Sequence, residues 1–267
     1  AIGFQTTAIV YGILGGVVIL YMSLTSREVR LEVDENKPGL WNSLKDLFKN
    51  RKFWMAGLAN AFYSAAMSLV LASMPFFVKY TLQLGDSQST FLFAAVLLIA
   101  IGCVAVWARL VRRFSLMPVW RTALITLAVA FVPLYFANSL PTAMAASALV
   151  GFGFAGVITT MDLIGARIID EDTRKHNLRR EGIISNALGF MNRLNGLFTS
   201  AAFFLVSVLF GFVSGDNPGP EPHNAARFLL TVFPPVLMVI SFAFSFLINF
   251  PEEKAAPAMP EPVAGLE

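Results

Sequence analysis

The chain has 267 residues, of which 56% are hydrophobic and only 14% are charged, whereas soluble domains contain roughly 25% charged residues. This composition, with a mean hydropathy of +0.66, excludes a soluble globular domain and indicates a membrane protein. The formal charge of +3 does not indicate nucleic-acid binding, because the meaning of a charge depends on its position. The single cysteine, Cys103, excludes an intrachain disulfide and a cysteine-rich metal site.

Seven apolar runs are long enough to cross a bilayer as helices, which takes about 20 residues. We therefore predict an all-α, polytopic membrane protein with seven transmembrane helices. The first run is too long for the apolar region of a signal peptide and has no basic residues before it. We expect a true span there and take the chain as a fragment of a longer protein. The runs are residues 2–24, 54–79, 91–110, 120–140, 142–164, 186–213 and 228–250.

Basic residues set the expected orientation. Alternate threading of the seven spans places 18 of the 20 Lys and Arg residues on one side of the membrane and leaves Lys79 and Arg227 on the other. Because basic loops stay in the cytoplasm, we expect the N-terminus outside and the C-terminus cytoplasmic, in a plasma membrane such as the bacterial inner membrane. Trp54, Trp107 and Trp120 lie beside basic residues, as residues of an interfacial belt do.

Composition divides the chain into four parts. Residues 1–24 are the first span, residues 25–53 a polar cytoplasmic linker, residues 54–250 the other six spans, and residues 251–267 a Pro- and Glu-rich tail with expected disorder. The linker contains a predicted amphipathic helix that would lie on the inner membrane surface or on the cytoplasmic ends of the bundle. A soluble, partner-binding helix is the alternative. The apolar face of this predicted helix in the linker consists of Leu40, Trp41, Leu44, Leu47 and Phe48, opposite Lys45, Asp46 and Lys49.

No pattern typical of an enzyme occurs in the sequence, neither a nucleophile elbow nor an HExxH, Walker or dinucleotide-binding motif. His176 and His223 have no second ligand at metal-binding spacing. We therefore predict neither enzymatic activity nor a cofactor or metal site. The remaining signal is polar residues inside spans, which are costly in lipid and usually face a cavity or another helix.

Small and polar residues form one stripe along the sixth span, and Arg193 adjoins it. An arginine facing lipid at this depth would cost roughly 3 kcal/mol, so Arg193 should face the interior or reach towards the interface. The stripe indicates either a water-filled path with Arg193 paired to a substrate or carboxylate, or close helix packing through small residues. Its members are Gly182, Ser185, Gly189, Asn192, Gly196 and Thr199.

Two other spans carry weaker signals. In the second span, Asn60, Ser64 and Ser68 recur at helical spacing, although serines often bond within their own helix instead of binding a ligand. The fifth span has three glycines that permit close backbone approach, Gly151, Gly153 and Gly156.

A charged loop, DEDTRKHNLRREG at residues 170–182, joins the fifth and sixth spans. Its acidic triplet could hold a cation, but the surrounding Arg and Lys residues favour a solvated salt-bridge network. Asp162 lies beside Arg167 near the end of the fifth span, where an ion pair at the cytoplasmic face and a role in transport are both open.

Three stretches carry a family resemblance: the loop DEDTRKHNLRREG, the second span RKFWMAGLANAFYSAAMSLVLASMPFFVKYTL and the last span ARFLLTVFPPVLMVISFAFSFLINF. They resemble the C-terminal half of the glycoside-pentoside-hexuronide:cation symporters, the melibiose-permease-like branch of the major facilitator superfamily. The loop matches that family's pattern of a leading Asp and a later Lys-Arg-x-Glu-Gly. The resemblance implies one helix of the N-terminal half, a linker and the six-helix C-terminal bundle.

The resemblance also implies a function: symport of a sugar, glycoside or uronate with Na⁺ or H⁺, by alternating access. The coupling-cation site would lie in the missing N-terminal half, which would be a necessary partner together with the bilayer. Arg193 stands where that family usually has a cavity-facing lysine. We expect substrate contacts from Arg193, Asn192, Asn60 and Ser64, and a cytoplasmic gate of Asp162, Arg167, Asp170, Arg179 and Glu181.

Three departures from the family pattern bear on the substrate. Asn177 stands in place of a glycine, Arg167 in place of an aspartate and Arg193 in place of a lysine. The planar fork of an arginine suits a carboxylate or phosphate better than a point charge does. A lipid or lysolipid transporter is therefore one alternative and a seven-helix receptor another, while the absence of a lysine from the last span disfavours a retinal protein.

Overall fold

The computed structural model describes residues 2–25, 40–176, 180–213, 218–248 and 250. Every regular element within these residues is a helix, which confirms the all-α prediction. Seven helical segments are long and apolar enough to span a membrane, and they coincide with the seven predicted runs. The predicted disordered tail lies outside the described residues, as does the part of the predicted linker between residues 26 and 39.

The chain divides into two units, residues 1–38 and 39–267. The first unit contains α1 (Ile2–Thr25), an apolar helix of 24 residues. Its sequence contains no charged side chain, so nothing in it opposes insertion into lipid.

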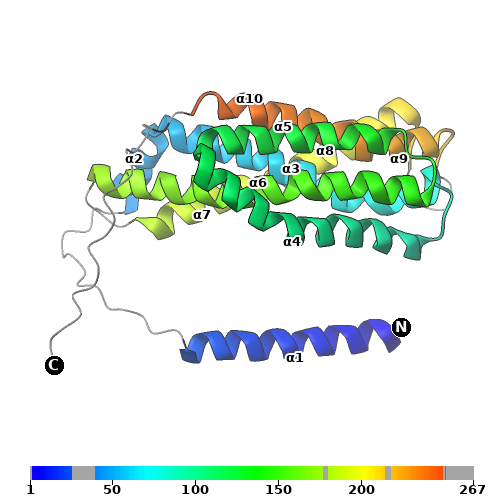
Figure 1. Ribbon diagram of the computed structural model, residues 1–267, viewed down its shortest axis with the longest axis horizontal. Coiled ribbons are helices and arrows are strands. Elements are labelled where there is room, and N and C mark those ends of the chain that lie inside the picture. Colours follow the sequence, from blue (N-terminus) through cyan, green and yellow to red (C-terminus); the bar gives the residue numbers. More distant parts are fainter. Residues whose placement is uncertain (1, 26–39, 177–179, 214–217, 249, 251–267) are drawn as a thin grey trace. The chain divides into compact units, whose positions relative to one another are not determined.

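The second unit is a helical bundle in which six spans lie side by side (Figure 1). The helix α6 packs against α4 and α5, while α3 packs against α8 and α10, and contacts between α5 and α10 join the two groups. The elements are α2 (Leu40–Lys49), α3 (Arg51–Phe76), the π-helical turn η1 (Phe77–Thr81), the 3₁₀ turn η2 (Asp86–Gln88), α4 (Ser89–Phe114), α5 (Leu116–Tyr135), α6 (Leu140–His176), α7 (Glu181–Asn192), α8 (Asn195–Phe210), α9 (Pro222–Thr231) and α10 (Phe233–Ser245).

Three glycines of α6 allow its neighbours to approach the backbone closely, as predicted. A Cβ atom at Gly153 would lie 2.6 Å from the Cα of Leu127 in α5, and one at Gly156 would overlap the ring of Trp107 in α4. A Cβ at Gly151 would overlap the carbonyl of Val96. These positions explain how α6 sits between α4 and α5.

The charged stretch predicted as a loop is helical as far as His176, where α6 ends. The pairs Glu171–Lys175 and Asp172–His176 are spaced i,i+4 and are in contact, which stabilises a helix. Basic residues in the last turn also complement the helix dipole. The prediction of a loop over this stretch was therefore wrong for most of its length.

The last predicted span is two helices, α9 and α10, which meet at Val232. Pro234 follows directly, and a proline inside a helix removes a backbone donor. The helix α9 already begins at Pro222, six residues before the predicted start of this span at residue 228, and it includes His223.

Two of the tryptophans expected at the membrane interface lie inside the bundle. Trp120 is fully buried, and Trp107 is buried with its Nε1 donating to the carbonyl of Phe152 at 3.0 Å. Only Trp54 among the three is half-buried, at the start of α3. The neighbouring basic residues misled the prediction for Trp107 and Trp120, because they indicate depth but not which way a ring points.

Candidate functional site

Amide and hydroxyl side chains link the middle of α3 to the end of α7 and the start of α8. The amide nitrogen of Asn60 donates to the Oδ1 of Asn192 at 2.9 Å. One turn further along α3, the amide nitrogen of Asn195 lies 3.3 Å from the Oγ of Ser64 and 3.2 Å from the Oγ of Ser68. We call these five residues the amide–hydroxyl cluster; it contains three of the four predicted substrate contacts.

A break in the helix lies within this cluster. The helix α7 ends at Asn192 and α8 begins at Asn195, with Arg193 and Leu194 in a turn. The amides of Arg193 and Leu194 donate to carbonyls three residues back instead of four, a tighter pattern that often marks a hinge inside a helix. The predicted stripe along one continuous helix is therefore divided between two helices.

Arg193 lies beside the cluster but not in it. Its side chain is exposed and, among the residues that the structure describes, makes no hydrogen bond or ion pair. Within this chain it therefore does not join Asn60, Ser64 and Asn192. A guanidinium without a partner at this depth needs water or an anion from elsewhere.

The glycines of the predicted stripe face open space. A Cβ atom at Gly182, Gly189 or Gly196 would meet no heavy atom within 4 Å. Within the second unit no described helix packs against these glycines, so close packing through them, one of the two interpretations of the stripe, is not found there. The close contact lies elsewhere, where Met191 of α7 fills the notch at Gly57 of α3.

Asn195 is the cluster member that the sequence analysis missed. It lies three residues after Asn192 and four before Thr199, so its helical spacing was visible in the sequence. A polar amide in an apolar span was the available signal.

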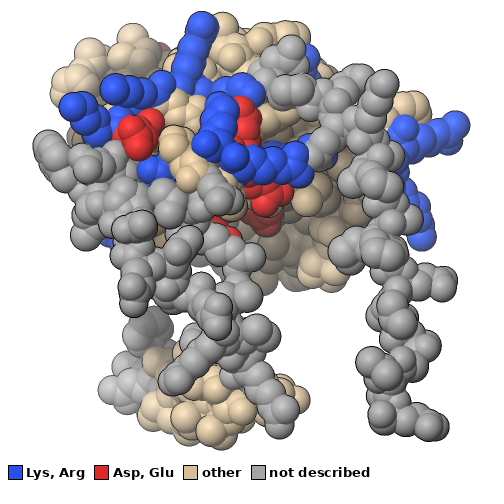
Figure 2. Space-filling view, turned by 90° about the vertical axis from the view of Figure 1, so that its left-hand side faces the viewer, with Lys and Arg blue, Asp and Glu red and all other residues tan. Residues whose placement is uncertain are grey.

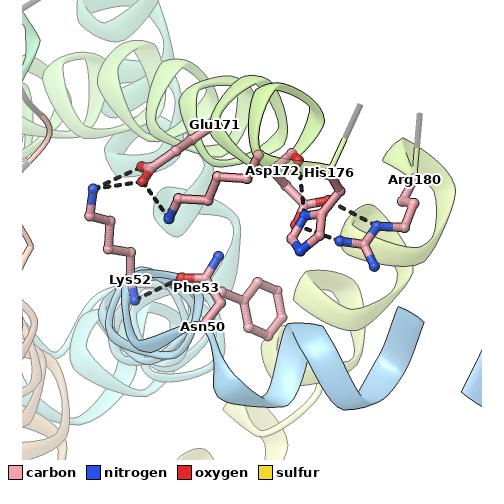
Figure 3. Close-up of polar contacts among 8 residues, drawn as sticks. Asn50, Lys52, Phe53, Glu171, Asp172, His176 and Arg180 are labelled. Carbon is pink, nitrogen blue, oxygen red and sulfur yellow. Dashed lines mark hydrogen bonds and ion pairs between the residues drawn. The ribbon is translucent and has the colours of Figure 1, made fainter. Parts of the chain in front are cut away.

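A second polar site lies at the end of the bundle that carries α2 (Figure 3). The guanidinium of Arg180 binds both carboxylate oxygens of Asp172, with Nε at 3.1 Å from Oδ2 and Nη2 at 3.0 Å from Oδ1. Both side chains are buried, at 6% and 3% exposed. Asp46 of α2 lies 3.5 Å from the same guanidinium, and the Nδ1 of His176 lies 3.2 Å from Asp172.

A neighbouring ion pair holds the start of α3 to the end of α6. The ammonium of Lys52 lies 2.8 Å from Glu171 Oε1, and that of Lys175 lies 2.9 Å from the same oxygen. Asn50 is the N-cap of α3, since its Oδ1 accepts from the amides of Lys52 and Phe53 at 3.1 and 3.3 Å. Together with the Asp172–Arg180 pair, these contacts fasten four elements to one another, and we call them the ion-pair cluster.

None of the contacts that define this cluster involves a predicted gate residue that the structure describes. Asp162, Asp170 and Glu181 are exposed, Arg167 is half-buried, and Arg179 lies outside the described residues. The acidic triplet does form salt bridges as predicted, but the Asp172–Arg180 pair is buried and not solvated. Lys52 and Asp46 were missed because they contact Glu171 and Arg180 across more than a hundred residues.

The family model described as "MFS/sugar transport protein" matches residues 1–252. The chain belongs to this family. It is therefore a multi-pass membrane protein of the major facilitator superfamily, a class of transport proteins and not of enzymes. No curated protein matches the chain.

Membership of the major facilitator superfamily allows the amide–hydroxyl cluster to be compared with the ligand sites of transporters. In transporters that are built from repeated helical bundles, ligand sites lie near the bilayer midplane, where a helix is interrupted. The break at Arg193 and Leu194 is such an interruption, and Asn60, nine residues into α3, is about 14 Å from the start of that helix at 1.5 Å per residue. The major facilitator transporter thus carries hydrogen-bonding side chains where one of its membrane-spanning segments is interrupted.

Proposed function

We propose that this transporter moves a sugar, glycoside or uronate across the membrane together with Na⁺ or H⁺, by alternating access. The observation that carries the proposal is the amide–hydroxyl cluster at the break between α7 and α8. Side-chain amides both donate and accept hydrogen bonds, so they suit ligands with many hydroxyl groups. The description of the matching family as a sugar transport protein supports the same ligand class.

In this proposal Asn60, Asn192 and Ser64 bind substrate hydroxyls, and Asn195 and Ser68 extend the set. The hydrogen bond between Asn60 and Asn192 would open when the substrate replaces it. Arg193, exposed beside the cluster, would pair with a carboxylate on the substrate, because its guanidinium binds planar anions through two parallel hydrogen bonds.

The coupling cation and the opposing half of the transporter belong to the proposal as well. The open space beside Gly182, Gly189 and Gly196 supports a partner surface there, which we assign to an N-terminal six-helix half. We propose that the cation site lies in that half and that the end carrying α2 is cytoplasmic. The ion-pair cluster, with Asp162, Arg167, Asp170, Arg179 and Glu181 around it, would brace the cytoplasmic gate.

The test is uptake by the full-length parent in membrane vesicles, with a panel of labelled glycosides, uronates and lysolipids, with and without a Na⁺ or H⁺ gradient. We expect gradient-driven uptake of a sugar or uronate. Asn60→Ala and Asn192→Ala should each lower kcat/KM at least tenfold, which corresponds to about 1.4 kcal/mol. Arg193→Ala should abolish uptake of a uronate and spare that of a neutral glycoside.

Thr199→Ala is the matched control, because the Thr199 hydroxyl bonds the carbonyl of Asn195 in its own helix and should matter little. Uptake of lysolipids alone would replace the sugar assignment with a lipid one. Unchanged uptake in both asparagine variants would remove the amide–hydroxyl cluster from the substrate site.

A further inference from the structure

An apolar groove of about 470 Å³ opens at the end of the bundle that carries α2. It lies between α2, the start of α3 and α7, and it is separate from the amide–hydroxyl cluster. Asn186 contributes an amide to an otherwise apolar lining. The lining includes Phe48, Trp54, Ile183, Ala187, Phe190 and Met191.

The walls of this groove present apolar surface to the outside. Phe48 and Phe190 are 63% and 70% exposed, whereas Met191 closes the base and is buried. The Nε1 of Trp54 donates to the carbonyl of Phe48 at 2.9 Å, which fixes one wall at the junction of α2 and α3. A volume in the range of ligand pockets with such walls suits a hydrocarbon chain and not a sugar.

Three exposed basic residues lie within three positions of the groove-lining residues Phe48 and Phe53 in the chain. Lys45 and Lys49 lie one turn apart on α2, and Arg51 begins α3. All three side chains are exposed, and none makes an ion pair with another described residue. Lys52, by contrast, is neutralised by Glu171.

The other charged residues at this end of the bundle do not cancel the positive charge of Lys45, Lys49 and Arg51. Arg180 is paired with Asp172, so Asp46 at 3.5 Å from the same guanidinium and Glu181 at the start of α7 are the two acidic residues that offset the three basic ones. Figure 2 looks onto this end and shows Lys and Arg side chains gathered over it, with Asp and Glu between them. The rim therefore has a net positive charge next to an apolar slot.

We propose that this groove binds an anionic phospholipid of the adjacent leaflet, with an acyl chain along Phe48, Trp54 and Phe190 and the headgroup phosphate at Lys45, Lys49 and Arg51. Basic residues beside a bilayer attract anionic lipids, and a tryptophan at such a site lies at the level of the headgroups. Neither a soluble peptide nor a sugar would match both the apolar slot and its charged rim.

Trp54 provides a direct readout, since it lines the groove. In a Trp41→Phe background the remaining tryptophans are Trp54, Trp107 and Trp120, and the last two are 3% and 0% exposed. We would reconstitute this variant in phosphatidylcholine vesicles that contain either brominated phosphatidylglycerol or brominated phosphatidylcholine, and measure fluorescence quenching by contact with bromine.

We expect brominated phosphatidylglycerol to quench Trp54 at a mole fraction several-fold lower than brominated phosphatidylcholine requires. The triple variant Lys45→Gln, Lys49→Gln and Arg51→Gln should remove this difference. The matched control is Arg109→Gln, Arg112→Gln and Arg113→Gln near the end of α4, three exposed residues at the same end of the bundle, and it should retain the difference.

A second variant, Ala187→Phe, would fill the groove without changing its charge and should weaken quenching by both lipids. Equal quenching by the two lipids in the parent would overturn the proposal, because the rim would then select no headgroup. An equal loss of the difference between the two lipids in both triple variants would also overturn the proposal. The attraction of anionic lipid would then not depend on Lys45, Lys49 and Arg51 in particular. Absence of quenching by either lipid would mean that protein covers the groove.

Discussion

At the scale of single residues, the buried pair Asp172–Arg180 is the most consequential contact of the ion-pair cluster. Two hydrogen bonds join the guanidinium to both carboxylate oxygens, and neither side chain reaches water to any useful extent. Removing one partner of such a pair leaves an uncompensated buried charge. Asp170, two residues earlier, is exposed and provides a matched comparison.

Asp172→Asn should therefore lower the free energy of unfolding by about 3–5 kcal/mol, while Asp170→Asn should change it by less than about 0.5 kcal/mol. Both values can be measured from unfolding in mixed detergent micelles. The double variant Asp172→Leu with Arg180→Met should recover most of the loss, because no lone charge remains. A double variant as unstable as Asp172→Asn would show that packing, and not charge, sets the cost.

The Asn60–Asn192 hydrogen bond permits a double-mutant cycle. Each substitution to alanine removes the same bond, so the coupling energy should be about 0.6 kcal/mol and no more than about 1.7 kcal/mol, as in double-mutant cycles of hydrogen bonds between membrane helices. Unfolding of the two single variants and of the double variant in the same micelles gives this value. A coupling energy near zero would mean that the two amides do not meet in the membrane.

At the scale of elements, the apolar runs predicted the spans well, but their ends and breaks were not predictable from hydropathy. The helix α6 continues to His176 because local ion pairs support a charged helix outside the membrane. No proline and no run of β-branched residues indicates the break at Arg193 and Leu194 in the sequence. Asn60 and Asn192 were found because amides stand out in apolar spans.

The ion-pair partners of the charged residues could not be predicted from the sequence. Lys52 and Glu171 are 119 residues apart in the chain, and no local pattern pairs residues at such a separation. The pairing follows from the antiparallel arrangement that brings the start of α3 to the end of α6. Hydrophobic periodicity gives the number of helices but not which of their ends meet.

The glycines of α6 give a prediction for packing between elements. Gly153→Ala should lower the free energy of unfolding by about 1–3 kcal/mol, because its Cβ would overlap the backbone of Leu127. Gly165→Ala is the control in the same helix, since nothing lies within 4 Å of its Cβ. It should be neutral or slightly stabilising, as alanine has the higher helix propensity. Similar losses in both variants would indicate that α6 does not contact α5 through Gly153.

At the scale of the whole molecule, the distribution of charge makes the orientation testable. Ser115 lies between α4 and α5, and Ser139 lies between α5 and α6, both exposed. Consecutive connections of a multi-pass bundle lie on opposite sides of the membrane. The distribution of basic residues predicts that Ser115 lies on the inside.

In a Cys103→Ser background, Ser139→Cys should react with a membrane-impermeant maleimide added to intact cells, and Ser115→Cys should react only after the membrane is opened. The measurement is labelling of the two variants with and without permeabilisation. Labelling of Ser115→Cys in intact cells would reverse the threading and place the end with α2 outside.

The junction at Asn50 has a mechanical consequence. A single residue separates α2 from α3, its side chain caps the second helix, and the indole of Trp54 ties back to Phe48 across the joint. A joint this short between α2 and α3 extends very little when the chain is under tension. Force applied to the chain ahead of α2 therefore acts as torque on α3 and reaches Asn60 through a stiff lever, while the contact of Asp46 with Arg180 passes part of it to the start of α7.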